Sequence, residues 1–214
     1  ALGWVVVAAY AALLVATALT TPADRRPATG SGSDTAESAL IEAWARSRTG
    51  TFVTTGTFER RSDVTGASIA SEDVLAQRPP RRLHSQMGGV EGRDDERLLV
   101  CPAPPPDSEP EPCRYGPAGG PTYAEATERE LAGLRSLVGG TDPLYGVTVD
   151  DAGCFHLELR RSDPRATFGQ AAELCFDDET GALVRREVHH EGGIVEVLEV
   201  DEVRADVSDA DLAP

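Results

Sequence analysis

The chain has 214 residues and is strongly acidic, with 36 Asp and Glu against 20 basic residues and a formal net charge of −16. All of the basic residues are arginine. This balance argues against a nucleic-acid partner, because binding the phosphate backbone needs a basic footprint. It also argues against a folded domain that lies on an anionic lipid surface. The charge instead predicts a well-solvated domain.

The first 20 residues are the most apolar part of the sequence. Residues 2–19 carry no charge, and as a helix they would be about 27 Å long, close to the roughly 30 Å core of a bilayer. We expect a transmembrane anchor at residues 1–20, or a signal segment cleaved near Ala16-Thr17-Ala18. Residues 21–34 are rich in Pro, Gly, Ser and Thr, which predicts a flexible tether. Residues 35–214 then form one domain, large enough for its own core.

Four cysteines follow the apolar segment, and an even number in that context predicts two disulfides and an oxidising compartment. Cys101 and Cys113 flank a proline-rich stretch that their bond would close into a loop. Neither this pair nor Cys154 and Cys175 has the close spacing of zinc ligands, so we expect no metal. The cysteines therefore predict a single-pass protein of the cell membrane whose domain is extracytoplasmic, or a secreted domain if the first segment is cleaved.

Residues 35–101 read as one helix followed by strands. Apolar residues at helical spacing predict a helix over 35–48, which Gly50 ends. β-branched and aromatic residues predict strands over 51–61, 67–77, 82–90 and 97–101. Prolines within residues 78–82 separate the second strand from the third. The same residues form a basic run, which would face lipid headgroups or an acidic partner, or pair with the acidic surface of the domain. Residues 102–121, dense in Pro and Gly, predict an irregular loop.

The last part of the chain predicts a helix over 122–138 and then antiparallel strands. Phe155 and Leu157 alternate with polar residues, as do Leu174 and Phe176, which is typical of half-buried strands. Placing Phe155 opposite Leu174 brings Cys154 opposite Cys175, within disulfide distance.

Two tight turns follow these strands, at residues 178–181 and 192–193. The first turn would keep Phe176 opposite Val184, with Gly181 left-handed. We expect a bulge at Val197-Leu198 in the last strand and a solvated acidic tail at 206–211.

Helices segregated from antiparallel strands make this an α+β protein, and one curved antiparallel sheet with helices on its concave face uses every element. The order of these helices and strands, with several local sequence patterns, also resembles a bacterial family. The matching segments are AWARSRTG and TFVTTGTFERR, then RPPRRL, RLLVC and the closing run from LCFDDETG to DVSDADL, over residues 35–212. They resemble the LolA-like superfamily, which includes LolA, the LppX/LprG-type lipoproteins and the sensor domain of RseB.

The resemblance implies a half-open, incomplete β-barrel covered by helices, with a cavity for acyl chains or other hydrophobic groups. The absence of a lipobox, the four cysteines and the proline-rich insertion are departures from that family.

No catalytic motif accompanies these features, since G-x-S-x-G, H-E-x-x-H and P-loop patterns are missing from the sequence. We therefore expect no enzyme and no cofactor. The first hypothesis is a membrane-tethered module that binds a lipid or acyl chain by apolar burial in the hollow of the sheet. The residues expected to line the hollow, or to form plain core there, are Phe52, Phe58, Leu83, Leu98, Phe155, Leu157, Leu174 and Phe176. The alternative is an RseB-like envelope sensor that binds another envelope protein.

Overall fold

The computed structural model describes residues 32–101, 112–164 and 166–214. The predicted anchor and most of the predicted tether, residues 1–31, lie outside these ranges. Among the described residues, no helix has both the length and the apolar character needed to cross a membrane.

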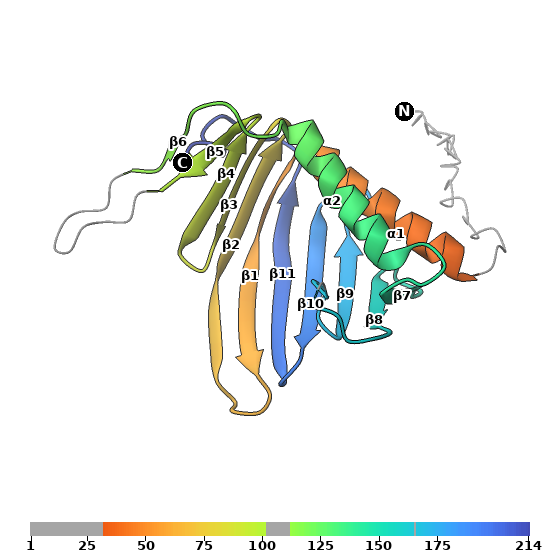
Figure 1. Cartoon of the computed structure of the whole chain (residues 1–214). Coiled ribbons are helices and arrows are strands. Elements are labelled where there is room, and N and C mark those ends of the chain that lie inside the picture. Colours follow the sequence, from red (N-terminus) through yellow and green to blue (C-terminus); the bar gives the residue numbers. More distant parts are fainter. Residues whose placement is uncertain (1–31, 102–111, 165) are drawn as a thin grey trace, which may run out of the picture.

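In the described part of the chain, eleven strands form one open antiparallel sheet (Figure 1). The strands are β1 (Phe52–Ser62), β2 (Ser68–Arg78), β3 (Arg81–Gln86), β4 (Gly89–Asp94), β5 (Arg97–Val100), β6 (Arg114–Tyr115), β7 (Tyr145–Val149), β8 (Phe155–Leu159), β9 (Ala171–Phe176), β10 (Leu183–His190) and β11 (Ile194–Arg204). Their order across the sheet is β6-β5-β4-β3-β2-β1-β11-β10-β9-β8-β7. Strands β1 to β6 therefore form one half and β7 to β11 the other, and the pairing of β1 with β11 joins the halves.

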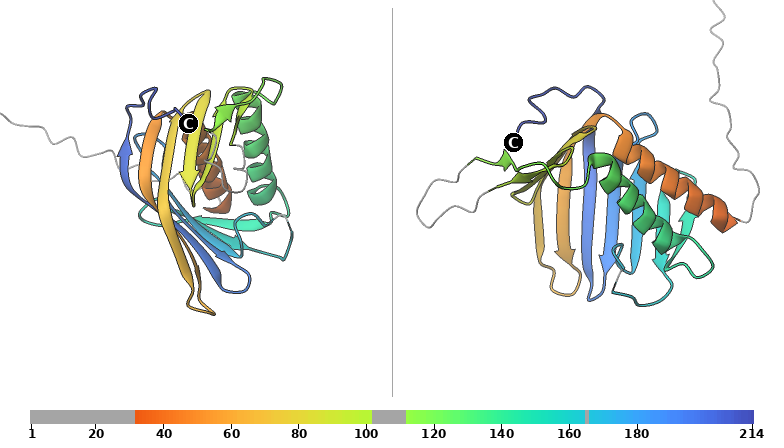
Figure 2. Two further views of the ribbon diagram at one scale, coloured as in Figure 1. Left: turned by 90° about the vertical axis from the view of Figure 1, so that its left-hand side faces the viewer. Right: turned by 45° about the horizontal axis from the view of Figure 1, so that its top comes forward.

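Two helices, α1 (Gly32–Thr49) and α2 (Tyr123–Val138), lie side by side inside the curve of the sheet (Figure 2). This confirms the α+β class and the curved, unclosed sheet. Helix α2 begins with a capping box: the Thr122 hydroxyl accepts from the Glu125 backbone N–H, and the Glu125 carboxylate accepts from the Thr122 N–H. These bonds satisfy N–H groups that have no partner within the helix.

Buried apolar residues form two clusters, one on each face of the sheet. The larger lies between the helices and strands β7 to β10, and includes Leu40, Leu134, Tyr145, Leu157 and Leu174. The smaller lies on the outer face, which we define as the face turned away from the helices. It consists of Val53, Ala76 and Leu212, with Leu83 and Val207 packed against it.

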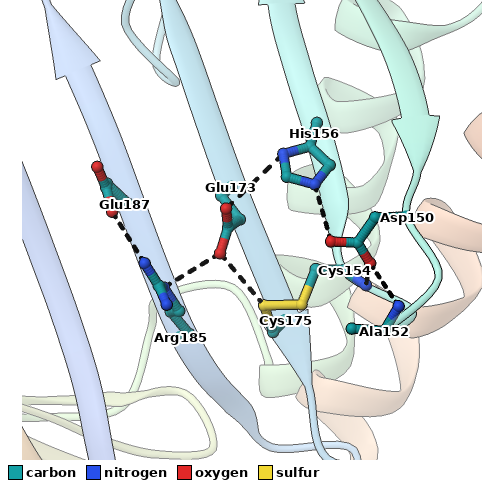
Figure 3. The surroundings of a disulfide bond; sticks show 8 residues. All are labelled: Asp150, Ala152, Cys154, His156, Glu173, Cys175, Arg185 and Glu187. Atoms are coloured by element: carbon teal, nitrogen blue, oxygen red, sulfur yellow. Dashed lines mark hydrogen bonds and ion pairs between the residues drawn. A yellow bond between two sulfur atoms is a disulfide. The ribbon is translucent and has the colours of Figure 1, made fainter.

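The predicted pairing of β8 with β9 is confirmed, since Phe155 lies opposite Leu174. Cys154 and Cys175 form a disulfide with their Cα atoms 4.4 Å apart, and Cys101 and Cys113 form a second. Figure 3 shows that the first bond lies on the polar face of the strands, beside the carboxylate of Glu173. Glu173 in turn pairs with Arg185 at 3.1 Å.

Several local predictions need correction. Gly181 is left-handed as expected, but Phe176 pairs with Leu183 rather than Val184, because the register shifts immediately after Leu183. The expected strand 82–90 is two strands, β3 and β4, since Met87 and Gly88 both adopt positive φ and turn the chain.

The bulge in β11 also lies elsewhere than expected. It occurs between Val200 and Glu202, opposite Gly56, rather than at Val197-Leu198. At Gly56 the β11 backbone approaches so closely that an added Cβ would lie 2.2 Å from the Glu199 carbonyl oxygen. The short strand β6 lies in the region expected to be irregular, and the rest of that loop, residues 102–111, lies outside the described residues.

Candidate functional site

A cavity of about 430 Å³ lies between the two helices and the middle of the sheet. Its floor comes from β1, β2, β3, β10 and β11, and its roof from α1, α2 and the segment that precedes β9. The apolar residues that line it are Trp44, Phe52, Leu75, Leu134, Leu137, Phe168, Leu183 and Leu198. Both the volume and the mainly apolar lining are typical of small-molecule sites, which range from about 300 to 1,000 Å³.

An aromatic group closes one side of this cavity. The ring of Trp44 meets Phe168 edge to face at 5.7 Å and Phe176 at 6.2 Å, a favourable arrangement of aromatic quadrupoles. Phe168 is itself held in place, because its backbone N–H donates to the Tyr145 hydroxyl, which donates to the carbonyl of Gly169. The aromatic wall is therefore anchored to the core.

An ion pair joins the two helices over the cavity. Arg48 on α1 donates from Nε and Nη2 to the two carboxylate oxygens of Glu130 on α2, at 2.8 and 2.7 Å, and Trp44 Nε1 also donates to that carboxylate. Burial on its own would raise the pKa of Glu130. The hydrogen bonds and charge of Arg48, with Trp44, hold that pKa below its usual range. Glu130 is therefore a carboxylate whose acceptor oxygens are already in use.

A second polar group lies on the floor of the cavity. The buried Asp73 accepts hydrogen bonds from His84 Nε2 at 2.8 Å and Gln86 Nε2 at 2.7 Å. This is an acid–histidine pair, but within the described residues no hydroxyl or thiol hydrogen-bonds to His84.

A further cavity, of about 450 Å³, lies between α2 and strands β3 to β5. Its lining includes Val90, Leu98 and Ala126. Four residues line both cavities: Arg48, Arg82, His84 and Glu130. The two hollows therefore share a polar wall.

The eight residues that the sequence suggested for the hollow lie in several different places in the structure. Phe52 lines the first cavity and Leu98 the second. Phe58 is buried in β1 and lies opposite Leu198, which lines the first cavity. Phe155, Leu157 and Leu174 belong to the large core cluster, with Phe176 packed against it. Leu83 lies on the outer face, because alternation along β3 turns it away from Arg82 and His84.

Sequence reasoning missed several lining residues. Leu75 and Leu198 lie on strands that were predicted, and alternation with Phe52 and Phe58 as reference points would have found them. Phe168 follows β8 in an irregular segment, where no periodicity marks it. Arg82 was included in the basic run 78–82, but it lies apart from Arg78 and Arg81, which bind the carboxylate of Asp209.

No protein-family model and no curated protein sequence matches this chain. Comparison with solved structures finds MucB, with 18% identity and a TM-score of 0.47, covering 86% of this chain and 64% of that one. The complex of MucA and MucB from Pseudomonas aeruginosa matches with 15% identity and a TM-score of 0.47, covering 84% and 61% of the two chains. A LolA superfamily protein from Nitrosomonas europaea matches with 12% identity and a TM-score of 0.34, covering 84% and 97%.

The chain spans less than two thirds of the length of the MucB chains that it matches. At these identities the likeness concerns the fold alone, and what the chain binds has to be inferred from its own residues.

Proposed function

We propose that this domain binds a hydrophobic ligand, such as a lipid or an acyl chain, in the cavity between its helices and its sheet, without covalent chemistry. The observation that carries the proposal is the unfilled volume of about 430 Å³ with its apolar lining. A cavity of this kind leaves its lining atoms without contact partners, so an apolar ligand would gain both burial and dispersion contacts. Ligand binding would therefore stabilise the folded state.

The proposal places the domain outside the cytoplasm. Its support is the two disulfides, which persist in oxidising compartments. Residues 1–20 would hold the protein at the membrane as a single-pass anchor, or direct secretion if they are cleaved. A domain near a bilayer would have lipids as its nearest source of apolar ligand.

The test is native mass spectrometry, with lipid extraction, on the protein produced in an oxidising compartment and exchanged out of detergent. We expect a ligand at a ratio of one per chain. The variant Leu198→Trp fills part of the cavity and should lose that ligand. Val149→Trp is the matched control, because Val149 is 45% exposed on β7, away from the cavity, and should keep it. A wild-type protein without ligand, which also takes up no added lipid, would contradict the proposal.

A protein partner is the second candidate function. It is favoured by β7, which ends the sheet order among the described residues and there leaves one backbone edge open to strand addition. MucB has been solved in complex with MucA. A lipid-free protein that binds an envelope protein through this edge would support this alternative. Proline substitution at Val149 in β7, whose N–H points away from β8, should then abolish the complex.

A further inference from the structure

The side chain of Arg82 lies in the wall shared by the two cavities. In the described ranges, Arg82 has neither a hydrogen bond nor an ion pair, although a guanidinium offers five N–H donors. Arg82 is half-buried and lines both cavities. Arg82 is thus a cation placed to meet whatever enters them.

Two acidic groups that line the same cavity as Arg82, Glu130 and Asp73, are committed to other partners. Both oxygens of Glu130 accept from Arg48, and one also accepts from Trp44. Asp73 accepts from His84 and Gln86. Glu130 and Glu91 attract Arg82 at longer range, but neither forms an ion pair with it. The positive charge of Arg82 therefore has no direct counter-charge among the described residues.

The surroundings also make this charge costly. Burial lowers the pKa of the Arg82 guanidinium below its usual value, and the neighbouring charge of Arg48 lowers it further. A cation in such a place is stabilised by an anion that arrives with its own oxygens, because a guanidinium binds a carboxylate or phosphate through two parallel hydrogen bonds. Arg82 also lines the apolar cavity, so a ligand bound to its guanidinium can place an apolar part in that cavity.

We propose that the ligand is an anionic amphiphile: its carboxylate or phosphate head pairs with Arg82, and its alkyl chain lies among Trp44, Phe168 and Leu198. This inference rests on the proposed function, since it names the class of hydrophobic ligand that the same cavity takes. It gives the polar wall a role in selectivity, because a neutral head would leave the guanidinium unpaired.

The test compares three ligands of equal chain length, dodecanoate, dodecyl phosphate and dodecanol, by isothermal titration calorimetry at pH 8 with the full chain. We expect the wild type to bind the two anions at least about tenfold more tightly than the alcohol, the difference expected for a charge-assisted hydrogen bond in a partly buried site. A preference for dodecyl phosphate over dodecanoate would indicate a phosphate-bearing lipid, and the reverse a free fatty acid.

The variant Arg82→Gln should lose this preference while its affinity for dodecanol stays the same, and Arg82→Lys should retain part of it. Arg135→Gln is the control of equal charge, because Arg135 is exposed on α2 and pairs with Glu128, and it should behave as the wild type. Equal affinity of the wild type for anions and alcohol would overturn the inference and leave the proposed function standing. No binding of any of the three would overturn both.

Discussion

At the scale of single residues, one buried amide holds the end of α1 to the sheet. The side chain of Gln77, fully buried in β2, donates from Nε2 to the carbonyls of Ser47 at 2.8 Å and Gly50 at 2.9 Å. Its carbonyl oxygen lies 3.1 Å from the hydroxyl of Tyr123. Carbonyls at a helix C-terminus have no partner within the helix, so Gln77 satisfies groups that would otherwise be buried unpaired.

This arrangement predicts that Gln77→Glu destabilises the protein by about 3 kcal/mol at pH 7, because a carboxylate would face two carbonyls and lose both donors. The folded state would hold the new carboxyl's proton more tightly than the unfolded state does. The loss should therefore shrink as the pH falls toward 5. Urea unfolding at both pH values measures this. The control is Gln170→Glu, at an exposed position, which should change little.

A loss of stability in Gln77→Glu that does not depend on pH would mean that side-chain shape, rather than the hydrogen bonds, matters at this position.

At the scale of elements, α2 is both a packing element and the roof of the two cavities. Its apolar residues Leu131, Leu134 and Val138 are buried, while Thr122 and Glu125 fix the point where it begins. The sequence predicted its extent to within one residue, because the helical spacing of its apolar residues and the terminal Gly139 are local signals.

We expect Thr122→Ala to cost about 1 kcal/mol in the free energy of unfolding, since it removes the acceptor for the Glu125 N–H. Ser136→Ala is the matched control, because Ser136 is exposed in the last turn of the same helix, far from the cap, and alanine is the better helix former. Thermal unfolding should show a lower Tm for the first variant and an equal or higher Tm for the second. Equal effects would show that the cap contributes nothing beyond propensity.

The elements that the sequence predicted well share one property: each is specified by its own residues or by its nearest neighbour in the chain. The register of β8 with β9 followed from the alternation around Phe155 and Leu174. The bulge in β11 did not, because it depends on the close approach of that strand to Gly56, far away in the sequence. The position of Leu83 on the outer face was missed for a similar reason, since no local pattern says which face the helices cover.

At the scale of the whole molecule, the last residues of the chain tie the two halves of the sheet together. After β11, Leu212 packs in the outer cluster with Val53 and Ala76, while Arg78 and Arg81 bind Asp209. The sequence predicted a solvated acidic tail at 206–211, and Asp206 and Asp209 are exposed, but the segment is also held in place by ion pairs with arginines. Asp211 pairs with the nearby Arg204, but the two arginines that bind Asp209 lie more than a hundred residues earlier, where no local pattern points to them.

Leu212→Ala should therefore destabilise the domain by about 2–4 kcal/mol, as expected when a fully buried leucine is truncated. Leu98→Ala is the comparison, because Leu98 is 50% exposed on β5, and its effect should be below about 1 kcal/mol. Both values come from urea denaturation at constant pH. Similar small losses in both variants would mean that the end of the chain is not part of the cooperative fold.

The pairing of β1 with β11 also sets a sequence of events during synthesis. The first strand of the described sheet lies beside the last, so the middle of the sheet cannot be completed until β11 has been made. Until then β1 has an open backbone edge, which is prone to pair with other chains. The two cysteines of each disulfide are close in sequence, 12 residues apart in one bond and 21 in the other, and each bond lies within one half of the sheet. In the exported protein proposed above, each half could therefore become oxidised before the closing strand arrives.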